Sequence, residues 1–315
     1  MTESRLTPAQ LGVTATPPVA QRRQTSRQYH GINLSDDYAW LKDDSYPTVD
    51  DEPVLAYLNA ENAYFEAVMA PHEELTERLF TELKGRIKEE DESVPYRHGD
   101  WLYGWRFAQG AQYRTWYRRS AAGGDDEIIL DEPSLAVDLE YFLLGGWDVH
   151  PRHDLLAWSA DTNGSERFTL QVKRLSTGEV LPDRIENTIG APVWAEDGEH
   201  LLYLEVNEQW RPFRVRLHAL GTDPDQDPIL YEEQDASFFV GLSKTRSRRF
   251  LLMYTGDHVT TEVRTVPATD PMAQPTLIAP RQTGHQYTVD HAGDQFYIRT
   301  NDTHKNFRVV TAPIA

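Results

Sequence analysis

A short pattern occurs five times along this chain, and it restricts the possible folds more than any other feature of the sequence. Each copy has an anchor residue, a turn residue four positions later, and then a short apolar or aromatic segment. The anchors are 47 to 52 residues apart, and they are Pro95, Trp147, Trp194, Leu242 and Val289. Repeats of about 40–50 residues with several strands each are typical of β-propeller blades. The fifth copy stops short of a full repeat at Ala315, so we expect the chain to end inside a blade.

The segments after the turns have the composition and the period of two that strands show. In three copies the turn residue is glycine, at positions Gly99, Gly198 and Gly293. The strands that should follow the five turns are Trp101–Tyr103, Leu155–Trp158, Leu201–Tyr203, Phe250–Leu252 and Phe296–Ile298. Among the later strands of each repeat we expect Phe168–Leu175, Phe213–Leu220 and Thr276–Ala279. Hydrogen-bonded hairpins built from such strands would make up each blade.

The N-terminal part of the chain has a different, helical pattern. Residues 1–28 are polar with few apolar residues, so we expect them to be loosely attached. A helix should start where Asp51 or Glu52 can cap it, with Pro53 in its first turn.

The break at Ala70-Pro71 should end this helix, and a second helix should run from about Glu73 to near Gly85. We therefore expect an N-terminal extension and helix pair over residues 1–92, and an incomplete β-propeller of four to five blades over residues 93–315. The fold class is mainly β.

Composition narrows the possible partners. The formal charge is −19, which disfavours nucleic acids and favours cationic ligands. There is no cysteine, which excludes disulfides and permits a reducing compartment. No apolar run approaches the length of a membrane span, and Met1 to Gln28 lacks the apolar core of a secretory signal. We expect a cytoplasmic protein that contacts neither membranes nor nucleic acids.

The sequence contains no strong motif for a catalytic nucleophile. The G-x-S-x-G elbow, which raises a serine at a strand-to-helix turn, is absent. Ser159, Ser165 and Ser243 lie in predicted strand ends and turns, where serine is common for structural reasons. We therefore expect no catalytic residue within these 315 positions.

The sequence also contains no strong motif for a metal site. His150 and His153 are three residues apart, but the loop that carries them is broken by proline. Asp161–Glu166 resembles the start of a calcium loop without its remaining ligands, and its Asn-Gly pair is more typical of a hairpin. The sequence therefore predicts neither a metal nor a cofactor.

Paired carboxylates leave one alternative function open. Some five-bladed propellers hydrolyse glycosides with two inward-facing acids at a defined separation. The acidic residues in or beside the first strands and turns are Asp148, Asp197, Glu205 and Asp290. The sequence cannot supply their separation, and turn aspartates commonly serve only to bind backbone N–H groups.

Several motifs in fixed order resemble the prolyl oligopeptidase family of serine peptidases, and within it oligopeptidase B most closely. The segment Asp37–Asp44 is similar to the family's N-terminal acidic motif with its central tryptophan. Asp161–Glu166 followed by Leu175–Gly178 resembles its second-blade signature. Tyr231–Glu233 and Asp290-His291 resemble parts of its fourth and fifth blades.

The resemblance implies a seven-bladed propeller that covers an α/β-hydrolase half and admits short peptides, which are cleaved after Lys or Arg. In that family the Ser, Asp and His of the catalytic triad lie in the C-terminal half, so this chain alone should be inactive. Short basic peptides and the hydrolase half are the expected partners. Glu166 and Arg167 are expected to make polar contacts with that half or with substrate. A stand-alone propeller that binds proteins is the remaining alternative.

Overall fold

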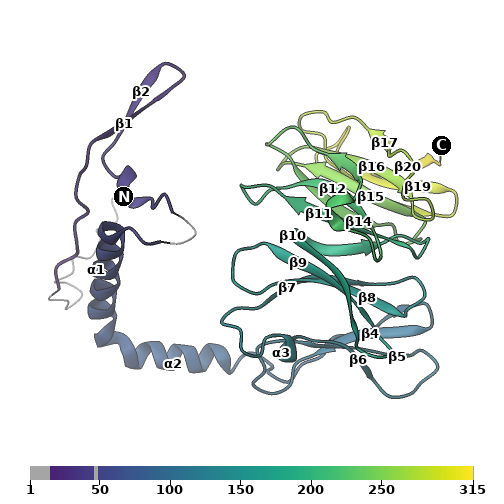
Figure 1. Cartoon of the computed structure of the whole chain (residues 1–315), viewed down its shortest axis with the longest axis horizontal. Helices are drawn as coiled ribbons and strands as arrows, with labels where there is room; N and C mark the ends of the chain where they lie inside the picture. The colour runs from purple at the N-terminus through teal and green to yellow at the C-terminus, as the bar shows by residue number, and fades with distance from the viewer. Residues whose placement is uncertain (1–14, 46–48, 315) are drawn as a thin grey trace. The chain divides into compact units, whose positions relative to one another are not determined.

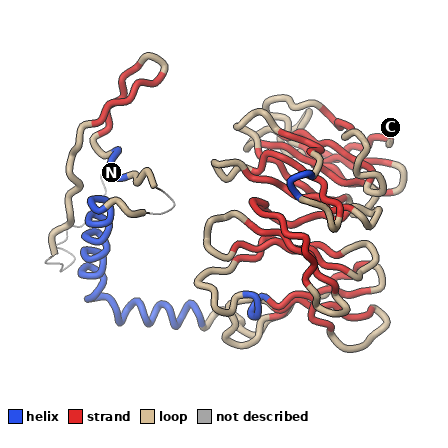
Figure 2. Tube along the Cα trace, viewed as in Figure 1, coloured by secondary structure: helices blue, strands red, loops and turns tan. Residues whose placement is uncertain are grey.

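The computed structural model describes residues 15–45 and 49–314. The chain folds as two compact units, Met1–Lys88 and Glu89–Ala315. The first unit contains helices and one hairpin, and the second is built almost entirely of strands (Figure 2).

The first unit has six short or medium-length elements. In chain order these are β1 (Thr25–Tyr29), β2 (Ile32–Asp36), a 3₁₀ helix η2 (Ala39–Leu41), α1 (Glu52–Met69), a 3₁₀ turn η3 (Ala70–His72) and α2 (Glu73–Lys84). The predicted helix pair is confirmed. Asp51 is the capping residue, because its Oδ1 accepts the N–H of Val54 at 3.0 Å.

Residues 1–14, at the start of the segment that we expect to be loosely attached, lie outside the described part of the chain, and an unpredicted hairpin begins at the end of that segment. Residues 25–29 pair with 32–36 in an antiparallel hairpin. His30 and Gly31 both have positive φ, at 49° and 79°, which is the turn geometry that suits a two-residue hairpin loop. Both strands are polar and largely exposed, so hydrophobic alternation gave no signal for them.

The second unit contains five blades (Figure 1). The first sheet is β3 (Tyr96–His98), β4 (Trp101–Arg106), β5 (Thr115–Ser120) and β6 (Glu127–Asp131), followed by the short helix α3 (Glu132–Leu135). A seven-stranded sheet holds β7 (Leu143–Val149), β8 (Leu155–Asp161), β9 (Phe168–Arg174), β10 (Val180–Trp194), β11 (His200–Val206), β12 (Pro212–Ala219) and β13 (Ile229–Glu232), with η4 (Pro224–Gln226) before β13. The fourth blade is β14 (Phe239–Lys244), β15 (Phe250–Gly256), β16 (Thr261–Pro267) and β17 (Thr276–Ala279). The fifth has three strands, β18 (Tyr287–Ala292), β19 (Gln295–Thr300) and β20 (Arg308–Pro313).

The second and third blades share strand β10. Thr188 pairs with Phe168 of β9 on one side and with Glu205 of β11 on the other. Register shifts on both sides of this point let the long strand bend as it passes from one blade into the next. The outer strand of the second blade is therefore continuous with the first strand of the third blade.

The repeating turn predicted from the anchors is present in the structure. In the second, third and fourth blades, the residue that leads into the turn donates its N–H to a carbonyl five residues on. His150 bonds to Leu155, Ala195 to His200 and Thr245 to Phe250, all at 2.9–3.0 Å. The glycines at 99, 198 and 293 all have positive φ, which is why glycine suits these positions.

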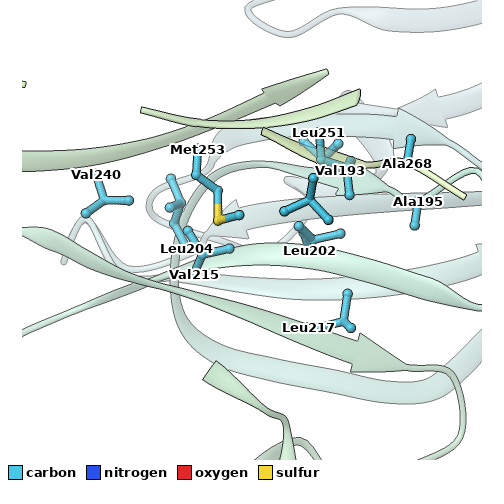
Figure 3. Close-up of a cluster of buried hydrophobic side chains, with 11 residues drawn as sticks. Val193, Ala195, Leu202, Leu204, Val215, Leu217, Val240, Leu251, Met253 and Ala268 are labelled. Carbon is cyan, nitrogen blue, oxygen red and sulfur yellow. The ribbon is translucent and has the colours of Figure 1, made fainter. Parts of the chain in front are cut away.

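Apolar side chains between neighbouring blades form the core. Figure 3 shows one cluster in which side chains of the third blade meet those of the fourth, such as Leu202 and Leu251, which are both fully buried. Trp194, one of the sequence anchors, is also fully buried in the cluster between the second and third blades. Because each blade can bury its faces only against its neighbours, the blades pack in chain order.

Gly146 allows β7 and β10 to approach closely. Its φ is +148°, and a Cβ there would lie 2.6 Å from Ala191 Cβ and 3.0 Å from Ala191 Cα. We expect Gly146→Ala to lower the free energy of unfolding by about 2–4 kcal/mol, from backbone strain and overpacking together. Gly178→Ala is the matched control, since Gly178 also has positive φ but an added Cβ meets nothing within 4 Å. Urea unfolding would contradict the prediction if both variants lost the same stability.

Candidate functional site at the two ends of the propeller unit

The blades place their turns at one end of the unit and their longer loops at the other. At the turn end, the connection between the first and second strands of one blade contacts the next blade, as when Arg246 N–H donates to Oδ1 of Asp290 in β18 at 2.9 Å. At the loop end, Trp210 Nε1 donates to the carbonyl of Ser165 at 2.7 Å. Residues 91–93 run beside the end of β4, so the chain also enters this unit at the loop end.

The two site residues predicted from the sequence, Glu166 and Arg167, lie in the β8–β9 loop at the loop end. The side chain of Glu166 is exposed, and the residue has φ of 57°. Arg167 is half-buried and reaches the third blade, where its Nη2 donates to the carbonyl of Asn207 at 3.2 Å and its guanidinium lies over Trp210. Arg167 therefore links two blades, whereas Glu166 is free to meet another surface.

The possible calcium loop is a self-contained turn. Asp161 is fully buried, and its two carboxylate oxygens accept the backbone N–H groups of Asn163, Gly164 and Glu166 at 2.8–3.0 Å. Across residues 15–45 and 49–314, no group of three His, Asp or Glu side chains is arranged to hold a metal ion.

The two histidines of the proline-containing turn have separate partners. His150 Nε2 contacts the carbonyl of Gly198 at 3.0 Å, and His153 Nδ1 contacts the hydroxyl of Tyr103 at 2.7 Å. They join neighbouring blades and do not converge on a common point.

Titratable side chains from four blades meet at the turn end. We call this set the turn-end charge cluster, and its members are His98, Asp148, Glu196, Lys244 and Arg248. Lys244 Nζ lies 2.7 Å from Glu196 Oε1 and 3.9 Å from Asp148 Oδ2. Arg248 binds the other oxygen of Glu196 at 3.0 Å and also contacts Nε2 of His98. The cluster therefore connects the first, second, third and fourth blades.

The protonation states in this cluster follow from burial and from the neighbouring charges. Desolvation lowers the pKa of His98 to about 4, with a further contribution from Arg248, so its Nε2 is free to accept a hydrogen bond. Burial alone would raise the pKa of Glu196, but hydrogen bonds from Lys244 and Arg248 lower it. Desolvation raises the pKa of Asp148 despite the nearby lysine. Because its positive and negative charges are paired with one another, the cluster is suited to holding neighbouring blades together and has no free group for catalysis.

Two of the three candidate serines have structural hydrogen-bond partners. Ser159 is fully buried and donates to the carbonyl of Gly190 at 2.5 Å. Ser165 Oγ accepts the N–H of Arg167, and the third, Ser243 of β14, lines the apolar cleft described below.

One serine–histidine contact was not predicted. Ser247 Oγ lies 2.8 Å from His291 Nδ1. Within the described residues, Nε2 of His291 is buried without a hydrogen-bond partner, so no acid orients the ring as a catalytic triad requires. Ser247 also accepts the N–H of Arg249, which makes it a turn hydroxyl.

The four carboxylates of the glycosidase alternative are all engaged by protein groups. Asp148 accepts the N–H of Trp194 at 2.9 Å. Asp197 binds His200, and Glu205 binds Arg214 and Arg216. Asp290 accepts backbone N–H groups. These contacts favour structural roles for the four residues.

A cleft of about 650 Å³ opens between the third, fourth and fifth blades. Its lining is mostly apolar and aromatic and includes Leu204, Phe239, Tyr254 and Tyr287. Gly241 makes room for the Tyr254 ring, which would lie 2.0 Å from an added Cβ. Such a surface can hold apolar side chains of an extended peptide.

Of the turn-end charge cluster, only Asp148 was among the candidate residues predicted from the sequence, although the sequence contains a signal for the cluster. Asp148, Glu196 and Lys244 each follow an anchor by one or two positions. Equivalent positions of successive blades lie at the same end of a propeller, so a periodic search for charge would have found three of the five residues.

Comparison with known proteins assigns the chain to a family. Residues 17–315 match the family model described as prolyl oligopeptidase, N-terminal beta-propeller domain. The chain is 39% identical to dipeptidyl aminopeptidase BI of Pseudoxanthomonas mexicana, over 96% of this chain and 44% of that protein. It is 31% identical to protease 2 of Moraxella lacunata, over 94% of this chain and 44% of that protein.

A solved structure shows the same architecture. Oligopeptidase B from Leishmania major aligns with a TM-score of 0.87 and 27% identity, over 95% of this chain and 45% of that one. This chain therefore spans a little under half the length of the relatives that it matches. No helix in the described part of the chain is long and apolar enough to cross a membrane. The chain belongs to the prolyl oligopeptidase family, and its strands form blades of that family's N-terminal propeller domain.

Proposed function

We propose that this chain is the propeller part of an oligopeptidase B-like serine peptidase that hydrolyses short peptides after Lys or Arg. The observation that carries the proposal is the family match over residues 17–315, together with relatives that are peptidases of about twice this length. In this proposal the propeller admits and steers substrates. Acyl transfer takes place on a serine of the hydrolase half, so this chain alone is inactive.

The first unit, extended to residue 92, would pack against the hydrolase half. Helix α2 supports this, because Leu79, Phe80 and Leu83 are 47%, 59% and 59% exposed, respectively. Exposed apolar side chains grouped on one helix indicate a surface that a partner covers. Glu166, exposed at the loop end, would face the same half.

The charge of the chain supports cationic substrates. A formal charge of −19 concentrates basic peptides near the protein and repels nucleic acids. A cytoplasmic location is part of the proposal, and the absence of cysteine agrees with it.

A chimera tests the proposal. Residues 17–315 would replace the matching part of the Pseudoxanthomonas mexicana relative, and the product would be assayed with a fluorogenic peptide that ends in two arginines. We expect hydrolysis by the chimera, none by this chain alone, and little on a neutral peptide of the same length. A folded chimera without activity would contradict the proposed role. Hydrolysis by this chain alone would show that it holds catalytic residues of its own.

A further inference from the structure

A second pocket lies between the first and second blades and has a different character from the apolar cleft. Its volume is about 630 Å³. Six aromatic rings line it, and they belong to Tyr96, Phe107, Tyr113, Trp116, Phe142 and Trp147. Two pairs of these rings meet edge to face, Tyr113 with Phe142 at 5.5 Å and Trp116 with Trp147 at 5.2 Å between centroids. The rings are therefore held in place by one another.

One carboxylate lines this pocket, and it is almost fully buried. Glu132 is 7% exposed, and its Oε1 accepts the indole N–H of Trp116 at 2.6 Å. Among the residues that the structure describes, no Lys, Arg or His forms an ion pair with it. A buried carboxylate with only a neutral donor is costly, because desolvation of the charge is not repaid by an opposite charge.

Arg114, which carries a positive charge, also lines this pocket. Its side chain is exposed and its guanidinium lies over Trp105, Phe107 and Trp116, at 4.9, 5.6 and 5.8 Å from the ring centroids. It therefore interacts with the aromatic rings of the pocket but leaves the carboxylate of Glu132 without an ion pair.

From this arrangement we infer that the pocket between the first and second blades binds an organic cation, of the kind presented by a Lys or Arg side chain or by the amino terminus of a peptide. Aromatic faces attract cations, most strongly when water is excluded, and the buried carboxylate supplies the opposite charge. The pocket volume suits one such group with part of the adjoining chain. Assigning the cation to a peptide substrate rests on the proposed function, whereas the binding itself involves no peptidase step.

The experiment uses this chain as it is and follows the indole N–H signal of Trp116 by NMR, assigned with Trp116→Phe. Three probes separate the sources of the cation. Nα-acetyl-arginine amide carries only a basic side chain, leucine amide carries only a free amino group, and Nα-acetyl-norleucine amide is neutral. We expect a saturable shift with one or both of the cationic probes and at least about tenfold weaker binding of the neutral probe.

Two variants test the residues. Glu132→Gln keeps an oxygen for the Trp116 hydrogen bond but removes the charge, and it should weaken binding of the cation at least about tenfold. Arg114→Gln removes a repelling charge and should leave that binding unchanged or strengthen it. Equal binding of neutral and cationic probes, or no saturable shift with either cation, would overturn the inference. Because the comparison of probes needs only the unaltered chain, it decides the question even if a variant does not fold. If this chain bound no cation, the activity expected of the chimera would be unaffected, so the two proposals can fail independently.

Discussion

Replacing His218 with alanine is expected to lower the free energy of unfolding of the propeller unit by about 3–5 kcal/mol. His218 is fully buried in the third blade between two buried carboxylates. Its Nδ1 lies 3.0 Å from Asp227 and its Nε2 lies 3.0 Å from Asp183. In its protonated form the ring donates from both nitrogens, one to each carboxylate. Alanine would leave two buried carboxylates without their shared partner.

Urea unfolding followed by tryptophan fluorescence measures this loss. His200→Ala is the control, because His200 makes a similar contact to Asp197 at 2.7 Å but its side chain is 24% exposed. We expect the control to cost less than about 1 kcal/mol. Equal losses in the two variants would show that burial of His218 with Asp183 and Asp227 does not increase its contribution to stability.

The pH dependence of this network has a defined sign. Burial alone would lower the pKa of His218, but hydrogen bonds to Asp227 and Asp183 outweigh it and raise the pKa above the usual 6.5. The stabilisation is therefore fully present below pH 6.5 and is lost as the pH rises through the pKa of the folded state. NMR titration of the His218 ring should give a midpoint above 6.5, and a midpoint below that value would refute the assignment.

Replacing Arg281 with alanine is expected to cost about 3 kcal/mol. Arg281 Nη2 lies 2.5 Å from Glu233 and 3.3 Å from Glu262, and both glutamate side chains are only 6% exposed. Its guanidinium also stacks over Phe238 at 4.2 Å. Removal of the arginine would leave two nearly buried carboxylates short of positive charge, at a point where the third and fourth blades meet.

Arg308→Ala is the matched control, because Arg308 forms a 2.7 Å ion pair with Asp302 on the surface, where the arginine side chain is 49% exposed. Loss of that pair should cost less than about 1 kcal/mol. Urea unfolding of both variants checks the difference, and an Arg281 variant as stable as the Arg308 variant would contradict the prediction.

Acid sensitivity provides a second measurement for Arg281. Burial alone would raise the pKa values of Glu233 and Glu262, but hydrogen bonds from Arg281 lower both. The stabilisation that these two ionised carboxylates give the folded state is fully present above the usual pKa range of carboxylates. It is lost as the pH falls through their lowered pKa values. Without Arg281 the two acids should protonate at higher pH, so acid unfolding of Arg281→Ala should begin at a higher pH than in the unaltered chain.

Much of the architecture could be predicted from local and periodic features. Asp51 caps α1 and the Ala70-Pro71 pair ends it, because caps and proline act on the residues next to them. Strand β17 has the predicted bounds Thr276–Ala279. The hairpin of residues 25–36 and the continuity of β10 could not be predicted in this way. The hairpin lacks an apolar face, and β10 depends on register shifts that pairing with two different neighbours imposes.

Less of the candidate site than of the fold could be predicted from the sequence. Glu166 and Arg167 were placed in the correct loop, but nothing local to them indicated that Arg167 would bind the third blade at Asn207. Glu132 carried no motif, and its burial among aromatic rings follows from the packing of the first blade against the second. Side-chain roles of this kind depend on which surfaces meet.

By itself the sequence determined the repeat, the turn positions and the helix ends, because these depend on residues close together in the chain or on strict periodicity. Tertiary structure alone decided which charges meet. His98 and Arg248 are 150 residues apart, and His218 and Asp183 are 35 apart. Such contacts form only when blades have packed face to face, since burial both brings the groups together and removes the water that would otherwise weaken their attraction.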